Sequence, residues 1–289
     1  MRKRRAMNVQ SVLDYSAAHG GRACVIMQNS AVIGQNGITT TWDLQSGSKS
    51  FCGPLALKMR DEGLISSLDD KFSDTISEWF GASAQKKACS VRRGMCLTGG
   101  LNPGATGGKP TYAQSIGALM PIGDVGDMKY GPNIFGVYGE FVNRKVKPLG
   151  FTDNFDYLQQ KILLPLGITA TVDRLPDGNP HLAGGIRLNC LDWAKYGEYL
   201  RLGNFTELTG PGPDYVAYGF NFWRWIGDSA KLVAGNLAGS APMQGGGYSA
   251  AGDGNQRLII YPDLGIVCAR FGVDNSTYSD IEMETRLRA

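Results

Sequence analysis

The sequence predicts a mixed α/β fold in which both ends of the chain build one antiparallel sheet and helices fill the middle. Strand-like runs bounded by turn residues occur at 23–37, 218–226 and 255–272, whereas the middle of the chain has apolar residues at helical spacing. With 289 residues, 43% apolar and 19% charged, the chain can bury a substantial core. We expect a single unit of all 289 residues, with a sheet part at 1–45 and 204–289 and a mainly helical part at 46–203.

Local patterns predict the individual elements. "ACVIMQNSAVIGQNG" (23–37) has two apolar runs around "QNS" and predicts a hairpin. "YGFNFWRWI" (218–226) is strand-rich, and "NQRLIIYPDLGIVCARFG" (255–272) has two β-branched runs around a "PDLG" turn. "GGLNPGATGGKPT" (99–111) is expected to be a loop. Helices are expected where apolar residues recur every three or four positions, at 50–63, 134–146, 155–163 and 191–203.

Composition argues against several classes of function. A formal charge of +3, part of it in the opening "MRKRR", is too small to indicate a nucleic-acid partner. No stretch approaches the 18 apolar residues of a membrane span, and no apolar signal-peptide core follows the basic start. The chain is expected to be soluble, either cytoplasmic or exported with its signal removed. Its oligomeric state stays open.

The six cysteines indicate neither a metal nor a redox site. They are scattered, with no CxxC motif and no cluster with histidine, so reduced core cysteines are the expected reading. Two glycine patterns also fail as nucleotide sites. "GATGGKPT" has Pro110 where a phosphate loop needs a hydroxyl, and "GGGYSA" (245–250) has no evident strand before it or helix after it.

A Ser-His-acid triad is one alternative for the chemistry. "AQSIG" (113–117) is a variant of the nucleophile elbow, and His181 follows Ser115 in the appropriate order. However, no buried strand precedes Ser115, and His181 in "GNPHLAGG" reads as a loop histidine.

A serine activated by lysine is the other alternative. Ser46 and Lys49 in "QSGSKSFCG" are three residues apart, so on a helix they share a face. Burial of a lysine amine disfavours its charged form, which lets it accept a serine proton. Ser83 and Lys86 have the same spacing, but Lys86 is expected to be solvated. On spacing alone, a helix N-cap is the favoured explanation of Ser46, because caps far outnumber nucleophiles.

Further motifs resemble one family, in order along the chain. "SGSKSFCGPLALKMRDEGLISSLDD" (46–70) resembles the S-x-x-K helix of the penicillin-recognising serine hydrolases, which include class C β-lactamases, family VIII carboxylesterases and 6-aminohexanoate-dimer hydrolases. "CLTGGLNPG" (96–104) and "YGPNIFGVYGE" (130–140) are similar to the next two segments of that family. "GGIRLNCLDWAKYGEYL" (184–200) and "AAGDGNQRLIIYPDLGIVCARFG" (250–272) are similar to the last two. The resemblance implies a β-lactamase/transpeptidase-like fold.

The resemblance also implies roles for matched residues. Ser46 would be the nucleophile, Lys49 its base, and Tyr130 the residue that carries the proton to the leaving group. The backbone N–H groups of Ser46 and of Asp253, which follows Gly252, would form the oxyanion hole.

Two departures from the family pattern narrow the expected substrates. The asparagine of the second motif is replaced by Pro132, or at best shifted to Asn133. The basic residue of the third motif falls on Ala250, so a substrate carboxylate loses its charge partner.

The expected activity is therefore hydrolysis of a small-molecule ester or amide through an acyl-serine intermediate, without metal or organic cofactor. β-Lactamase or D,D-peptidase activity is one alternative, and a non-catalytic binding member of the same fold is another. The expected apolar acyl pocket is lined by aromatic residues near the matched motifs, namely Trp42, Phe222, Trp223, Trp225 and Tyr248.

Overall fold

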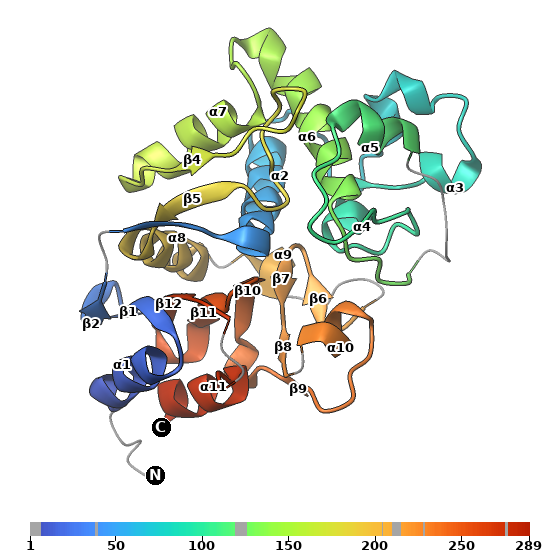
Figure 1. The fold of residues 1–289 in the computed structure, drawn as a ribbon. Coiled ribbons are helices and arrows are strands. Elements are labelled where there is room, and N and C mark those ends of the chain that lie inside the picture. The colour runs from blue at the N-terminus through green and yellow to red at the C-terminus, as the bar shows by residue number, and fades with distance from the viewer. Residues whose placement is uncertain are drawn as a thin grey trace.

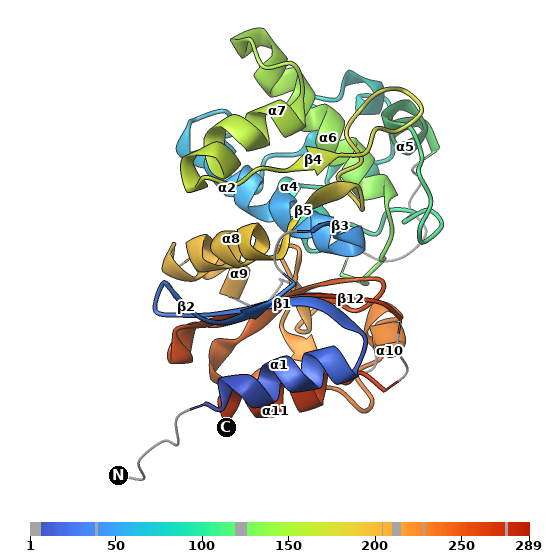
Figure 2. The ribbon, with the colours of Figure 1, turned by 60° about the vertical axis from the view of Figure 1, so that its left-hand side comes forward.

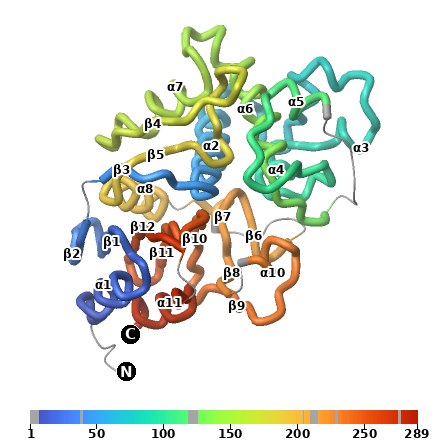
Figure 3. The backbone as a smooth tube through the Cα atoms, in the orientation of Figure 1, coloured from blue at the N-terminus to red at the C-terminus, as the bar shows by residue number. Residues whose placement is uncertain are grey.

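A sheet part and a helical part lie against each other in the protein (Figure 1). The structure, a computed structural model, describes residues 7–37, 40–118, 126–203, 205–209, 215–227, 229–274 and 277–289. The basic start of the chain lies outside these residues. Both described ends belong to the sheet part, as the blue and red segments of Figure 3 show.

The sheet part is built on a seven-stranded sheet whose strand pairs are all antiparallel. β1 pairs with β12, which joins strands from the two ends of the sequence, so the predicted sheet is confirmed. In spatial order the strands are β2 (Ala31–Asn36), β1 (Gly21–Gln28), β12 (Ile266–Gly272), β11 (Gln256–Tyr261), β10 (Tyr248–Gly252), β7 (Phe222–Trp223) and β6 (Tyr218–Gly219).

Turn residues define the two long hairpins, as predicted. Asn29 and Ser30 join β1 to β2 with φ angles of 48° and 71°, a pair of positive values that suits the right-handed twist of a hairpin. Between β11 and β12, a 3-10 turn at Pro262–Leu264 ends at Gly265, whose φ is 65°. Asparagine and glycine tolerate this left-handed region best, which explains why the sequence signals both turns.

Helices cover both faces of the sheet. α8 (Cys190–Leu202) packs on one face, and α1 (Val9–Ala18) and α11 (Asp280–Arg288) lie side by side on the other (Figure 2). Every residue of β12 is buried, because this strand lies between the two helical layers. α1 and α11 are additions to the predicted elements; Asn8 and Ser279 cap their N-termini.

The helical part contains most of the remaining helices. α2 and α6 agree with predicted helices, and the predicted 155–163 helix is observed as α7 followed by a π-helical turn at Gln159–Leu163. These and the other α-helices are α2 (Cys52–Asp61), α3 (Ala84–Lys87), α4 (Val91–Met95), α5 (Tyr112–Ala118), α6 (Asn133–Val146), α7 (Asn154–Leu158), α9 (Thr206–Thr209) and α10 (Ser229–Val233). The other 3-10 segments are Gln45–Phe51, Phe72–Asp74, Ser77–Trp79, Lys147–Leu149, Leu164–Leu166 and Gln244–Gly246.

Short strands complete the fold. β3 (Thr41–Asp43), β5 (Ile186–Asn189) and β4 (Thr171–Val172) form a small antiparallel sheet above the large one. β8 (Trp225–Ile226) pairs with β9 (Ala241–Pro242). The expected loop at 99–111 has no helix, and its only strand-like position is an isolated one at Leu101.

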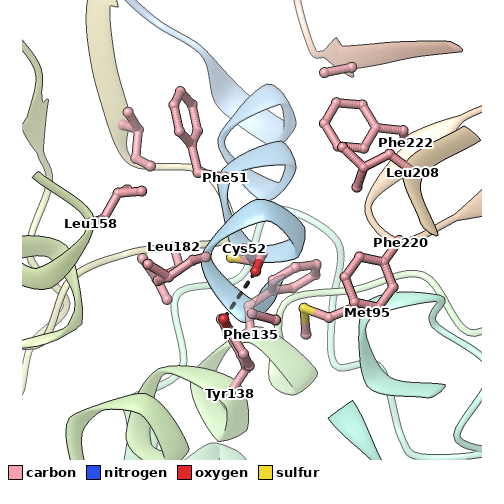
Figure 4. Packing of buried hydrophobic residues seen from close by; sticks show 14 of the residues in the cluster. Phe51, Cys52, Met95, Phe135, Tyr138, Leu158, Leu182, Leu208, Phe220 and Phe222 are labelled. Atoms are coloured by element: carbon pink, nitrogen blue, oxygen red, sulfur yellow. Dashed lines mark hydrogen bonds between the residues drawn. The ribbon is translucent and has the colours of Figure 1, made fainter. Parts of the chain in front are cut away.

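α2 is the central buried helix of the core (Figure 4). Phe51, Phe135 and Tyr138 surround its first turn, and the Tyr138 hydroxyl donates a 3.0 Å hydrogen bond to the Cys52 carbonyl. All six cysteines are buried, as expected for core cysteines, and none is paired in a disulfide in the structure. Within the described ranges, no helix combines the length and apolar character needed to cross a bilayer.

Candidate active site

Ser46 lies in a 3-10 helix, Gln45–Phe51, directly after β3. Gln45 has a φ of 50°, a left-handed conformation that is costly for a residue other than glycine. Its N–H donates a 2.8 Å hydrogen bond to Asp43 Oδ1, which holds this sharp turn. The chain therefore presents Ser46, which is half-buried, where the strand ends and helix α2 approaches.

Lys49 is 5% exposed, and its amine contacts the Ser46 hydroxyl. Lys49 Nζ lies 2.8 Å from Ser46 Oγ and 2.7 Å from the Ala183 carbonyl oxygen. The N-cap of this 3-10 helix is Leu44, without a side-chain hydrogen bond, so the Ser46 hydroxyl does not act as its cap.

The neighbouring serines have structural contacts. The sequence predicts helix caps or helix-surface hydroxyls at Ser48 and Ser50, but both are fully buried. Ser48 Oγ accepts a hydrogen bond from the Ile186 N–H, and Ser50 Oγ donates one to the Gly47 carbonyl. Of the three serines in the motif, Ser46 is the one that lines a cavity.

Tyr130 lies beside this pair, in the loop just before α6. The centre of its ring is 5.0 Å from Lys49 Nζ, and the ring stacks on Trp223 with centroids 6.0 Å apart. Among the described residues, its hydroxyl has no hydrogen-bond partner. The structure thus brings Ser46, Lys49 and Tyr130 together at one place, with the phenol free to meet a ligand.

The end of β10 forms the opposite wall of the site. Gly252 packs so closely on the turn before Ser46 that a Cβ there would lie 2.1 Å from the Leu44 carbonyl oxygen. Only glycine fits such an approach. Asp253 follows in the tight turn to β11, and both Ser46 and Asp253 line the larger cavity.

Two cavities meet at Ser46. The larger, about 520 Å³, has an apolar wall that includes Trp223, Trp225 and Leu232. The smaller, about 100 Å³, is lined by Lys49 and His181 together with part of the predicted loop at 99–111. This loop, which the sequence excluded as a phosphate loop, therefore borders the serine.

Three of the aromatic residues expected in the acyl pocket lie elsewhere. Phe222 and Tyr248 are buried in the core, where their rings meet edge to face with centroids 5.4 Å apart. Trp42 is half-buried and packs on Phe271. None of these three lines either cavity, whereas Trp223 and Trp225 line the larger one.

The substituted motif positions contribute little to the cavities. Ala250 is 2% exposed and brings no cation to the site. The Asn133 amide donates to the Asn102 carbonyl, so it serves the neighbouring loop, while Pro132 lines the smaller cavity.

The residues of the triad alternative are not arranged as a triad. Ser115 is fully buried within α5 against Gly136 of α6, and no strand precedes it. His181 instead lines the small cavity with Ser46, a placement that the sequence did not predict. Burial and the charges of Lys109 and Lys49 lower the pKa of His181 to about 4, so its ring is neutral at pH 7.

Charged groups give the larger cavity an acidic rim. Asp253 and Asp274 line it and have no ion-pair partner among the described residues. Arg257 also lines it, but this guanidinium is committed to a bidentate pair with Asp280, at 2.7 and 3.1 Å. No group of three or more metal-ligating side chains occurs in the described part of the chain.

Several solved structures match this chain over nearly its whole length. A penicillin-binding protein homologue from Caulobacter crescentus matches with a TM-score of 0.71 and 15% identity, over 97% of this chain and 95% of that one. A D-stereospecific amidohydrolase from a Streptomyces species matches with a TM-score of 0.68 and 16% identity, over 97% of both chains. A β-lactamase from Mycobacterium bovis matches with a TM-score of 0.67 and 16% identity, over 95% and 94%.

The chain has the β-lactamase-like fold. The resemblance read from the ordered motifs is confirmed at the level of the fold. No family model matches the sequence, and no curated protein matches it either. The likeness to this fold is therefore evident from the three-dimensional structure and from a few short motifs. The overall sequence identity to solved structures such as these is 14–16%.

Proposed function

We propose that this protein is a serine hydrolase that cleaves small esters or amides through an acyl-serine intermediate. The observation that carries the proposal is the 2.8 Å contact between the buried Lys49 amine and the hydroxyl of a cavity-lining serine, Ser46. A serine needs a neighbouring base to become a nucleophile, and a lysine at hydrogen-bond distance can act as one.

The proposed reaction has two steps. Ser46 Oγ attacks the carbonyl carbon while Lys49 takes the hydroxyl proton, and the carbonyl electrons move onto an oxyanion. The N–H groups of Ser46 and Asp253 stabilise that oxyanion. The proton held by Lys49 then passes through Tyr130 to the departing alcohol or amine as the old bond breaks, which restores both residues. Water attacks the acyl-serine in the same way, and Ser46 recovers its proton.

The larger cavity favours neutral or cationic groups of a substrate over carboxylates. Its apolar wall of Trp223 and Trp225 suits an acyl chain, and Asp253 and Asp274 repel an anion. Arg257 cannot serve as the anion partner because Asp280 and two backbone carbonyls already accept hydrogen bonds from its guanidinium. This argues against efficient β-lactamase or D,D-peptidase activity, since those substrates carry a carboxylate that needs a cation.

A non-catalytic binding protein of the same fold is the second candidate. It is favoured by the Tyr130 hydroxyl, which is hydrogen-bonded to neither Ser46 nor Lys49. Hydrogen bonds between catalytic groups often form or shorten only when a substrate binds. The missing hydrogen bond therefore does not argue against a catalytic role for Tyr130.

Ester turnover and active-site labelling together test the proposal. The purified protein is assayed with p-nitrophenyl acetate and butyrate, and its intact mass is measured after reaction with a fluorophosphonate. We expect turnover of both esters and one adduct, mapped to Ser46. Absence of both turnover and adduct would overturn the enzyme reading in favour of the binding protein.

A substrate panel then tests the charge preference. We expect p-nitrophenyl butyrate to react faster than its analogue with a terminal carboxylate, and nitrocefin to react slowest. Faster reaction of the anionic ester would contradict the proposed role of the acidic rim. Ser115→Ala is the control for the triad alternative and should leave turnover near wild type.

A further inference from the structure

The turn that carries Asp253 is held by side chains at nearly every carbonyl. Arg257 Nη1 donates to the carbonyls of Gly252, at 3.0 Å, and Gln256, at 2.9 Å. Arg270 Nη1 donates to the Asn255 carbonyl at 2.7 Å, and the Gln256 side chain donates to that of Gly254 at 3.2 Å. Two arginines thus hold the three-residue turn Asp253–Asn255 through hydrogen bonds to carbonyl groups of the turn and of the residues beside it.

The C-terminal segment encloses both arginines. Asp280, in the first turn of α11, accepts two hydrogen bonds from Arg257, at 2.7 and 3.1 Å. The Tyr278 ring lies 4.1 Å from the Arg270 guanidinium carbon and 5.7 Å from that of Arg257, and its hydroxyl bonds Asp280. We call Arg257, Arg270, Tyr278 and Asp280 the arginine clamp.

Burial makes the clamp a rigid support. Arg257 is 6% exposed and Arg270 is fully buried. Hydrogen bonds to the protein must therefore replace the hydrogen bonds that each guanidinium would make to water. An arginine holds its donors in a fixed planar fork, so the bonded carbonyls are fixed relative to one another. A peptide plane joins each carbonyl to the next N–H, and the Gly252 carbonyl is joined in this way to the N–H of Asp253.

We propose that the arginine clamp positions the Asp253 N–H as an oxyanion donor. The clamp carbonyl of Gly252 and the amide of Asp253 belong to one peptide unit, so the hydrogen bond from Arg257 sets the direction of that N–H. Gly252 also packs directly against the Leu44 carbonyl, close to Ser46. The inference rests on the proposed hydrolase function. It makes Arg257 a positioning residue, and it links α11 to the reaction.

Oxygen-to-sulfur exchange in the substrate provides the specific test. A thionoester places sulfur where the ester has its carbonyl oxygen, and sulfur is a larger and weaker hydrogen-bond acceptor. A well-placed oxyanion hole therefore prefers the oxygen ester, and loss of placement lowers that preference. We expect Arg257→Lys to lower kcat for p-nitrophenyl butyrate about 10- to 100-fold with KM changed less than threefold, and to lower the ester-to-thionoester ratio.

A matched control separates this role from general stability. Arg201 and Glu198 form another bidentate pair with little exposure, on α8, with distances of 2.7 and 2.6 Å. Neither residue lines the cavities beside Ser46. Arg201→Lys should therefore leave the ester-to-thionoester ratio unchanged. Asp280→Asn provides a milder variant of the clamp if Arg257→Lys fails to fold, and should lower the ratio in the same direction.

The outcomes distinguish the two proposals. If wild-type Ser46 is neither labelled nor active, the hydrolase function fails, and this inference fails with it. If the wild type is active but the clamp variants lose activity on both esters in parallel, with an unchanged ratio, the positioning role alone is overturned. A fall in the ratio for Arg257→Lys or Asp280→Asn, but not for Arg201→Lys, supports it.

Discussion

The two S-x-x-K pairs of this protein have the same spacing and nearly the same burial, yet only one has the geometry of a reactive pair. Lys49 is 5% exposed and Lys86 is 6% exposed. In the first pair, Lys49 Nζ lies 2.8 Å from Ser46 Oγ. In the second, Ser83 Oγ accepts a 3.3 Å hydrogen bond from the Lys86 backbone N–H, and Lys86 Nζ donates to Ile116 instead.

The backbone at the serine accounts for this difference. Ser83 is the N-cap of α3, with φ of −56° and ψ of 154°, so its side chain turns back on the first helical amides. Ser46 lies inside the 3-10 helix that follows the left-handed Gln45, and its side chain meets that of the lysine. Burial of the lysine therefore does not distinguish the two pairs; the backbone conformation at the serine does.

Removing each serine should produce the largest contrast. We expect Ser46→Ala to lower kcat/KM for p-nitrophenyl butyrate by at least about 10³-fold, because the nucleophile is lost. Ser83→Ala should retain wild-type turnover, since its hydroxyl caps a helix away from both cavities. Equal losses in the two variants would remove the distinction between the pairs.

Removing each lysine amine should give the next largest effect. Lys49→Met keeps a side chain of similar length but no base, and we expect a loss of about 10²- to 10⁴-fold in turnover. Lys86→Met should stay within about twofold of wild type in the same assay. A severe defect in Lys86→Met, with the fold intact by circular dichroism, would show that the second pair also serves activity.

The pH dependence of stability should report the burial of Lys86. Burial lowers the pKa of Lys86, so the unfolded chain binds this proton more readily than the folded one. The free energy of unfolding should therefore rise as the pH increases towards the ordinary lysine pKa. Urea unfolding between pH 7 and pH 10 should show a steeper rise for wild type than for Lys86→Met. Parallel curves would mean that the Lys86 amine is solvated.

The smallest expected effect concerns the cap itself. Ser83→Ala should lower the free energy of unfolding by about 1 kcal/mol, the usual contribution of an N-cap hydroxyl. Ser46→Ala should cost less, because the Ser46 hydroxyl caps no helix. Urea unfolding at pH 7 measures both. A larger cost at Ser46 would favour a structural role for its hydroxyl.

Local signals made most of the sheet predictable. The Asn29–Ser30 and Pro262–Gly265 turns each lie between two apolar runs, so the sequence contains both strands and the turn of each hairpin. The small β3–β5–β4 sheet was missed because its strands have two to four residues and its pairs join positions such as Trp42 and Leu188, far apart in sequence.

The contacts within the candidate site were predictable only between residues that are close in sequence. Ser46 and Lys49 follow from spacing and from ordered motifs, but His181 and the 99–111 loop reach the cavity through tertiary folding. Lys86 was expected to be solvated, and this was wrong, because Trp79 and the Ile116 carbonyl cover its amine. No pattern around Lys86 itself reveals those distant partners.

Strand alternation could have sorted the pocket residues. Neighbouring residues of a strand point to opposite faces, and residues two apart share one. In β7, Trp223 lines the cavity, while its neighbour Phe222 is buried in the core and does not. Likewise Ser249 and Ala251 line the cavity, while Tyr248 and Ala250 do not. Alternation within β7 and β10 would therefore have separated Trp223, which lines the cavity, from Phe222 and Tyr248, which belong to the core.

The six buried cysteine thiols can be used to measure local opening of the structure. Cys24 and Cys268 lie in the large sheet, and Cys190 begins α8, which packs on that sheet. Cys52 begins α2, and Cys89 and Cys96 flank α4 in the helical part. A thiol reagent can reach each of them only when its surroundings open. Alkylation rates of the individual cysteines, measured by mass spectrometry, would therefore show whether the sheet part and the helical part open together or separately. No cysteine needs to be introduced for this experiment.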